Sequence, residues 1–227
     1  MTIAEMHQLF KFQLDKLDSL NYPNFLPEEI DLLLNQAQDR FVKQRYGKNN
    51  LYRSSFEETQ KRTEDLKDIT VNANLTPAAN ASDNIDPNAV FVTLPTDHWF
   101  IVQERVVLNY LDCHDVLKSE YAEVRPIQHN EFSKVIKDPF KKPTLYKILR
   151  LMEAGRVELI APPNSTIATY KLRYIKEPVA MSITVPTNCE LSEHTHQEIV
   201  DIAIEMALEN IESQRYQTQL TEITKQE

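Results

Sequence analysis

The segment 192–220 reads SEHTHQEIVDIAIEMALENIESQRYQTQL. Its apolar residues recur at helical spacing and form two neighbouring strips along the helix axis. Because a helix at a protein surface needs a single apolar face, we expect this one to be packed on two sides, with Ala203 and Ala207 permitting close approach. The strips consist of Ile199, Ile202, Ala203 and Met206, and of Val200, Ile204, Ala207, Leu208 and Ile211.

Acidic side chains occupy the remaining face of this helix. At about 100° per residue, the carboxylates fall within a sector of roughly 80°. Like charges four residues apart destabilise a helix by about 0.2–0.5 kcal/mol per pair. The row has two interpretations: a solvated polar face, or the wall of a passage whose negative charge keeps a polyanion from binding. It consists of Glu198, Asp201, Glu205, Glu209 and Glu212.

Two histidines, His194 and His196, precede the helix. A catalytic zinc needs three protein ligands, and two ligands on one helix face stand four residues apart, which this pair does not match. We therefore expect no metal here. The pattern favours a helix start, with Ser192 or Thr195 as the N-cap and Glu198 beside the positive end of the helix dipole.

The composition argues against enzymes and nucleotide-binding proteins. The chain has two glycines, Gly47 and Gly155, too few for a phosphate-binding loop. A Gly-x-Ser-x-Gly elbow and a reactive cysteine motif are both absent from the sequence. Cys113 and Cys189 favour free thiols in a reducing compartment, with a disulfide as the alternative. The sequence thus predicts no catalytic residue and no cofactor.

The net charge of −9 argues against a protein that holds a phosphate backbone, because such proteins concentrate lysine and arginine. It is compatible with a protein that lets DNA pass without binding it. No run approaches eighteen apolar residues, so no membrane span is expected. The beginning, MTIAEMHQLFKFQL, lacks the features of a secretory signal.

Three helices are predicted in the first part of the chain. Thr2 and Glu5 form a capping-box pattern, and Pro27 opens a second helix that ends at Gly47. A second capping box, Ser55–Glu58, opens a mostly charged helix to about residue 66, suited to a surface or to another subunit. The first helix has apolar residues Ile3, Met6, Phe10, Leu14 and Leu17, and the second has Ile30, Leu33, Leu34, Ala37 and Phe41.

Strands are predicted from Val90 onward, where the apolar period changes. Residues 90–95 and 100–110 favour strands, with a short helix after Pro95 as an alternative for part of the second run. Residues 146–162 indicate a hairpin that turns at Ala154-Gly155, and residues 130–137 a short helix before Pro139. Residues 167–175 place Ala168, Tyr170, Leu172 and Tyr174 on one face of a strand.

This order predicts an α+β fold in which the N-terminal helices and the long C-terminal helix form a bundle, with an antiparallel β section inserted. The bundle comprises residues 1–70 and 190–216, and the β-rich section residues 90–189. Residues 71–89, rich in Asn, Ala and Pro, are expected to be an exposed loop or arm. Residues 217–227 are expected to be a flexible tail.

Four segments together resemble a known family. They are MHQLFKFQLDKLDSLNYPNFLPEEIDLLLNQAQDRFVKQRYG (6–47), VRPIQHNEFSKVIKDPFKKPT (124–144), YKLRYIKEP (170–178) and HQEIVDIAIEMALENIESQRYQ (196–217). The set resembles a virion ring protein of the head-to-tail connector in crAss-like and related tailed phages. The order of elements is also similar to that of adaptor (tail tubular) proteins of short-tailed phages. The resemblance is weakest over residues 71–89 and about 111–122.

The resemblance implies a homo-oligomeric ring of twelve copies, made in the host cytoplasm and built into the virion beneath the portal protein. Such a ring extends the DNA channel, lets genomic DNA pass without specific binding, and offers a platform to adjacent ring or tail proteins. It brings no catalytic, cofactor or metal residues. Residues 198–227 would dock on the portal or a neighbouring ring, with Arg215, Tyr216, Gln217, Leu220 and Ile223 as candidates.

Other functions stay open at this point. The chain could form a different neck or tail ring of the same virion, such as a stopper or tail tubular ring. An enzyme that uses the scattered histidines and carboxylates is a second alternative, and a cytosolic binding module that regulates the host is a third.

Overall fold

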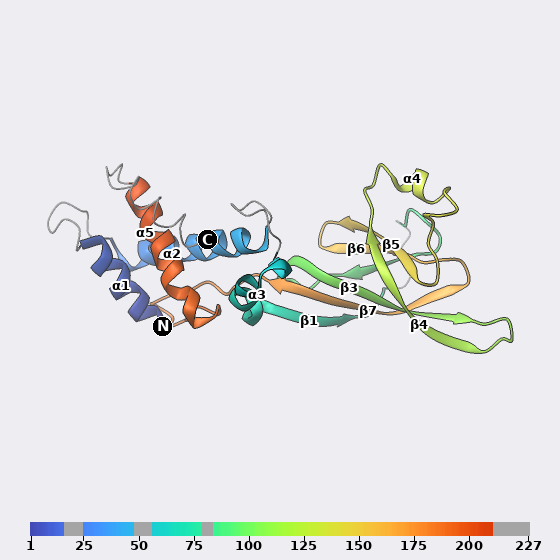
Figure 1. Cartoon of the computed structure of the whole chain (residues 1–227), viewed down its shortest axis with the longest axis horizontal. Helices are drawn as coiled ribbons and strands as arrows, with labels where there is room; N and C mark the ends of the chain where they lie inside the picture. Colours follow the sequence, from blue (N-terminus) through green and yellow to red (C-terminus); the bar gives the residue numbers. More distant parts are fainter. Residues whose placement is uncertain (16–24, 48–55, 79–83, 211–227) are drawn as a thin grey trace. The chain divides into compact units, whose positions relative to one another are not determined.

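The computed structural model describes residues 1–15, 25–47, 56–78 and 84–210 (Figure 1). The chain is α+β, as predicted, with helices and a seven-stranded curled sheet. It divides into two compact units, here called the helical unit (Met1–Ile69 with Pro178–Glu227) and the sheet unit (Thr70–Glu177). The β strands and one short helix are thus inserted between the two parts of the helical unit.

The helical unit contains α1 (Ile3–Asp15), α2 (Pro27–Tyr46), α3 (Gln60–Leu66) and α5 (His196–Asn210). Short 3₁₀ turns lie at Phe56–Glu58, Lys67–Ile69 and Glu193–Thr195. The predicted third helix is therefore a 3₁₀ turn followed by α3, and Ser55 of its capping box lies outside the described residues.

Both helix starts predicted near the N-terminus are confirmed. The Thr2 amide donates to the Glu5 carboxylate at 2.8 Å, and the Glu5 amide donates to Thr2 Oγ1 at 3.3 Å, so the capping box is formed. Pro27 is the first residue of α2, and the Glu29 carboxylate accepts the Leu26 amide at 2.8 Å. Each local pattern thus supplies the hydrogen bonds that the first turn of a helix cannot make internally.

Helix α5 packs against both α1 and α2, which confirms the expected two-sided packing. Its side chains from Ile199 to Ile204 are all buried, and so are Ala207 and Leu208. The small Ala203 and Ala207 are fully buried, as expected for positions of close approach. The opposing core of α1 and α2 consists of Ile3, Met6, Phe10, Leu14, Ile30, Leu34, Ala37 and Phe41.

The sheet unit contains seven strands and the short helix α4 (Phe132–Val135). The strand order is β1-β7-β3-β4-β5-β6-β2. The strands are β1 (Thr70–Leu75), β2 (Ala89–Thr93), β3 (His98–Leu111), β4 (Leu117–Pro126), β5 (Lys147–Glu153), β6 (Arg156–Ile160) and β7 (Ser165–Lys176).

The sheet curls because its inner face buries one core to which every strand contributes. Just after β1, the Ala78 amide donates to the Phe91 carbonyl of β2 at 2.7 Å, so the two outermost strands of the sheet approach each other. The predicted inward face of β7 is confirmed at Tyr170, Leu172 and Tyr174. A second cluster on β2, β5 and β6 is covered by α4 through Val135, Phe132 and Ile136.

Several predicted boundaries are wrong. Residues 71–75 belong to β1 rather than to a loop, because Val71, Ala73 and Leu75 alternate with asparagines and pack on the sheet core. The sheet is not wholly antiparallel: β4 and β5 pair in parallel, since α4 and its flanking loops carry the chain back between them. Residues 178–189 group with the helical unit, where the Met181 amide donates to Asn35 at 2.7 Å.

The predicted hairpin at Ala154-Gly155 is confirmed. It joins β5 to β6, and Gly155 has φ +71°, a left-handed conformation in which a side chain would be strained. The alternative of a short helix after Pro95 is wrong, because the strand β3 begins at His98. Strand β4 was not predicted.

Candidate functional site

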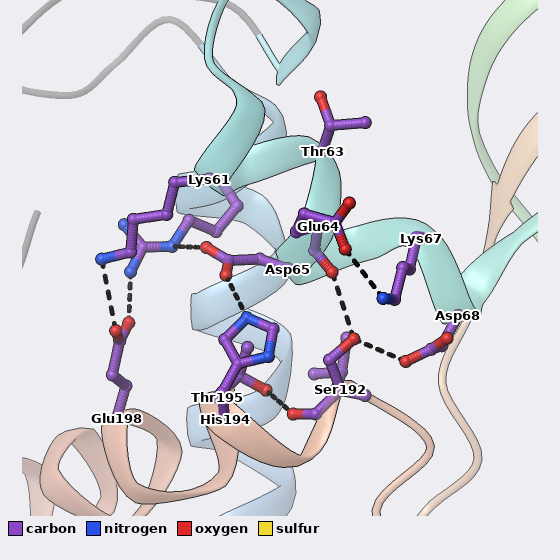
Figure 2. A network of polar contacts seen from close by, with 12 residues as sticks. Lys61, Thr63, Glu64, Asp65, Lys67, Asp68, Ser192, His194, Thr195 and Glu198 are labelled. Atoms are coloured by element: carbon purple, nitrogen blue, oxygen red, sulfur yellow. Dashed lines mark hydrogen bonds and ion pairs between the residues drawn. The ribbon is translucent and has the colours of Figure 1, made fainter.

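A polar network links α2, α3 and the start of α5 in the helical unit (Figure 2). Its centre is Arg45, which is 4% exposed. The Arg45 guanidinium forms ion pairs with Asp65 of α3 at 3.1 Å and with Glu198 of α5, and it lies over the Phe41 ring at 4.8 Å. The contact with Asp65 has the distance of an ion pair but not the orientation of a hydrogen bond. Arg45 thus connects three helices through charge.

The second half of the network joins α3 to the turn before α5. Figure 2 shows His194 directed at Asp65, at 2.8 Å between Nε2 and Oδ1, and Ser192 directed at α3. The Ser192 hydroxyl lies 2.5 Å from an Asp68 carboxylate oxygen and 3.1 Å from the Glu64 carbonyl. Thr195 donates to the Ser192 carbonyl at 2.7 Å. Ser192 is the N-cap residue of the 3₁₀ turn Glu193–Thr195, one of the two expected alternatives, but its side chain binds α3 and makes no capping bond.

The two histidines serve separate partners. His194 faces Asp65, whereas His196 is buried, with Nε2 2.9 Å from the Leu191 carbonyl and Nδ1 3.0 Å from the Met1 amino group. The Met1 amino group also pairs with Glu193 at 3.0 Å. Burial lowers the pKa of His196, which favours the neutral ring. The histidines fix the start of α5 to α3 and to Met1, and they do not converge on one point.

The carboxylates of the acidic row of α5 differ in their exposure and in their partners. Glu198 pairs with Arg45 and with Lys61, the latter at 3.3 Å. Asp201 is buried, and Glu205 is fully buried with Arg40 Nη1 of α2 at 3.3 Å. Glu209 is exposed, and Glu212 lies outside the described residues. The solvated face is therefore wrong for Asp201 and Glu205, since α2 supplies a cation and covers this part of the row. A place on a channel wall stays a prediction for the exposed Glu209.

The pKa of Glu205 is raised, mainly by burial, while Arg40 opposes and Glu209 adds to the shift. A carboxyl group with a raised pKa in the folded state binds its proton there more readily than in the unfolded chain. Stability therefore falls as pH rises through the interval between the two pKa values.

We expect Glu205→Gln to remove this dependence. The thermal midpoint of the helical unit should be higher in the variant than in the parent at about pH 7.5, and the two should converge towards about pH 4, where Glu205 is protonated. The matched control is Glu209→Gln, at an exposed position one turn later, which should change the midpoint much less. A midpoint difference for Glu205→Gln that is independent of pH would contradict this account.

The docking candidates of the C-terminal tail cannot be placed. Arg215, Tyr216, Gln217, Leu220 and Ile223 all lie outside the described residues. Sequence reasoning also missed the roles of Arg40 and Arg45. A buried acidic partner was not anticipated for either arginine.

A second polar group lies in the sheet unit. Glu104 of β3 accepts hydrogen bonds from Arg150 of β5 at 2.6 Å and from the Tyr170 hydroxyl of β7 at 2.7 Å. Burial raises the pKa of Glu104, against the lowering effects of Arg150 and Tyr170. Burial and the neighbouring Glu104 also raise the pKa of Tyr170. Glu104 thus links β3 to its neighbour β7 and to β5, which lies beyond β4, and both of its carboxylate oxygens are engaged.

A cavity of about 650 Å³ adjoins this group where β3 and β4 separate. Their ladder runs from Leu111↔Leu117 to Arg105↔Glu123, although β3 continues to His98 along β7 and β4 continues to Pro126 along β5. The lining includes Ile101, Glu104, Tyr121, Pro126, Tyr146 and Arg150. Arg150 spans the opening and binds the two strand pairs together.

The turn between β3 and β4 carries potential metal ligands that the sequence analysis did not single out. Atoms of Asp112, Cys113 and His114 lie within 4.8 Å of one another, the one such group among the described residues. However, the Asp112 carboxylate already pairs with Lys118 at 2.6 Å, and this bond, with that from the Cys113 amide, lowers its pKa to about 2. A structural zinc uses four ligands, and this turn supplies three.

The turn is flanked by exposed apolar side chains. Leu111, Val116 and Leu117 are each more than half exposed, and Leu111 and Leu117 stand opposite each other in the ladder. Over the described residues, no helix is both long and apolar enough to cross a bilayer. The described side chains therefore offer ion-paired polar networks inside each unit and exposed apolar side chains at this turn.

Comparison with known proteins gives a consistent result. A family model described as phage tail ring protein 3/4 matches residues 1–220. The chain is 25% identical to ring protein 4/5 of Bacteroides phage crAss001 over 228 residues, covering 91% of this chain and 92% of that protein. It is 26% identical to ring protein 3 of the same phage over 204 residues, covering 82% and 86% respectively.

Proposed function

This chain belongs to the phage tail ring protein 3/4 family, and from that premise we propose that it forms a homo-oligomeric ring in the neck of the virion, between portal and tail. The observation that carries the proposal is the match over residues 1–220, which covers the whole sheet unit and all but the last seven residues of the helical unit. The ring has twelve copies, extends the DNA channel, and presents a platform to the next tail component.

The distribution of charge supports a conduit. The helical unit has 21 acidic and 12 basic residues, whereas the sheet unit has 13 of each, so the whole net charge of −9 belongs to the helical unit. A negative surface facing the bore repels DNA phosphates and lets the genome slide. The helical unit, with a bundle of α1, α2 and α5, lines the bore, and exposed Glu209 is the described member of the acidic row that can do so.

The described side chains favour a structural role over an enzymatic one. Glu104, Glu198 and Glu205 are engaged by Arg150, Arg45 and Arg40 respectively, so none has the environment of an unpaired general base. The C-terminal tail, with Arg215, Tyr216, Gln217, Leu220 and Ile223, docks on the portal or on an adjacent ring. A stopper or tail tubular ring of the same virion is the alternative position.

The test is the mass of the purified full chain, alone and mixed with the portal protein of the same phage. We expect a closed oligomer, or one that forms when portal is added, with a mass that is an integral multiple near twelve of the 26.4 kDa chain. A variant ending at Asn210 should form the same ring but lose the association with portal. A persistent monomer that ignores the portal would contradict the proposal.

A further inference from the structure

Three basic side chains form an unusual group on the outer face of the sheet unit. Arg105 of β3 stands directly opposite Lys171 of β7, and Arg173 follows two residues along β7, opposite Gln103. All three are exposed, and Tyr121 of β4, 60% exposed, lies beside them. We call Arg105, Tyr121, Lys171 and Arg173 the basic sheet face.

Among the described residues, no carboxylate lies within 4.0 Å of the cationic groups of Arg105, Lys171 or Arg173. Like charges directly opposite each other in a sheet are destabilising. In the part of the chain that the structure describes, the polar partner of Lys171 Nζ is the neutral Tyr121, whose hydroxyl lies at 3.3 Å and whose ring centre lies at 5.1 Å. Arg173 donates to the Asn72 amide oxygen at 2.8 Å. Glu123 is opposite Arg105 in the β3–β4 ladder, but Arg105 makes no ion pair within 4.0 Å among the described residues.

A surface of opposite charge exists on the other unit of the same chain, which carries the whole net charge of −9. At the start of α2, exposed Glu28 lies between two exposed leucines, Leu26 and Leu32, which are 60% and 59% exposed. Glu28 and Leu32 are one helical turn apart and share a face. We call Leu26, Glu28 and Leu32 the α2 acidic surface.

We propose that the basic sheet face of one copy binds the α2 acidic surface of the neighbouring copy. This inference rests on the proposed ring function. The contact is heterologous, with a different surface from each copy, as closure of a ring requires. Arginine and tyrosine are enriched in protein interfaces, and the aliphatic leucines offer apolar area around the charged pair. A carboxylate between Arg105 and Lys171 also relieves the repulsion between them.

Duplex DNA is a less suitable occupant of this face. Proteins that hold DNA through its backbone commonly contact several phosphates, on the order of 6–10. The basic sheet face offers three cations, and Glu123 lies beside them in the ladder. The sheet unit as a whole is neutral, with 13 acidic and 13 basic residues.

A charge-swap experiment tests the proposal by sedimentation of the full chain. Lys171→Glu with Arg173→Glu should weaken assembly at least tenfold, and Glu28→Lys alone should weaken it in the same direction. Combining these three substitutions should restore much of the loss. The matched control, Lys141→Glu with Lys142→Glu, makes the same change of charge at exposed lysines of the sheet unit and should assemble as the parent does. Unfolding midpoints close to that of the parent would show that each variant folds.

The results of the charge-swap experiment distinguish a failure of the inferred contact from a failure of the proposed ring. If Lys171→Glu with Arg173→Glu assembles as the parent does, the inferred contact is wrong and the ring stands. If that variant assembles normally but loses affinity for a duplex DNA probe, the face binds DNA instead. The pairing is also wrong if Lys171→Glu with Arg173→Glu loses assembly and the further substitution Glu28→Lys does not restore it. A parent chain that stays monomeric with and without portal would reject the ring itself and the contact with it.

Discussion

Replacing Arg45 by alanine is expected to lower the free energy of unfolding of the helical unit by about 3–5 kcal/mol. The substitution leaves Asp65, which is 1% exposed, without its cation, and it removes the buried partner of Glu198. It also removes the packing of the guanidinium on Phe41. Because the chain has two units, a single global transition is not assumed, and hydrogen exchange of amides in α2 and α5 is the appropriate measurement.

The control for Arg45→Ala is Lys67→Ala. Lys67 also pairs with a carboxylate, Glu64 at 2.7 Å, but both side chains are about half exposed. Exposed pairs contribute little to stability, so this variant should exchange its amides much as the parent does. If Arg45→Ala destabilised α2 and α5 by less than about 1 kcal/mol, Arg45 would not be the centre of the network.

Replacing Arg150 by alanine is expected to destabilise the sheet unit by a similar amount, about 3–5 kcal/mol near neutral pH. The Arg150 and Glu104 side chains are 12% and 10% exposed, so the variant leaves an uncompensated carboxylate beside the Tyr170 hydroxyl. The bridge across the opening between β3 and β4 is lost as well. Hydrogen exchange of amides in β3 and β7 measures the effect.

The dependence on pH identifies the cause of this loss. The pKa of Glu104 is already raised above its usual 4.5, and removing Arg150, which lowers it, raises it further. The folded state then binds the proton more readily than the unfolded chain, so stability falls as pH rises from about 4.5 through the raised pKa. The loss in Arg150→Ala should therefore be largest at neutral pH and should diminish towards about pH 4.

A double variant provides the control for Arg150→Ala. Glu104→Gln with Arg150→Met removes both charges, retains volume, and keeps an acceptor for Tyr170, so it should recover much of the lost stability. An equal loss at neutral and acidic pH, with no recovery in the double variant, would show that packing rather than the buried charge decides the effect.

Local patterns were sufficient to predict the helix starts and the core positions. The apolar spacing from Ile3 to Leu14 and the Thr2–Glu5 capping box depend on neighbours within one or two turns, and all are observed. The hairpin at Gly155 is specified in the same way, by a residue that accepts φ +71°. These features need no information about distant residues.

Features that depend on distant partners could not be predicted. Asp201 and Glu205 belong to a row that is acidic along its length, and their burial follows from the packing of α5 on α2, which brings Arg40 to Glu205. Strand β4 was missed because its buried apolar side chains are few, Ala122 and Val124, and the rest face outward or are partly covered. Strand β1 is stabilised by its register with β7.

A cryo-EM reconstruction of the virion neck and tail would show directly whether copies of this chain close into a ring. We expect a closed ring coaxial with the portal and the genome, with density that accommodates both the helical and the sheet unit of this chain in every repeat. Side-chain density should place Lys171 and Arg173 of one copy against the start of α2 in the next. A reconstruction in which no coaxial ring fits this chain would contradict the account.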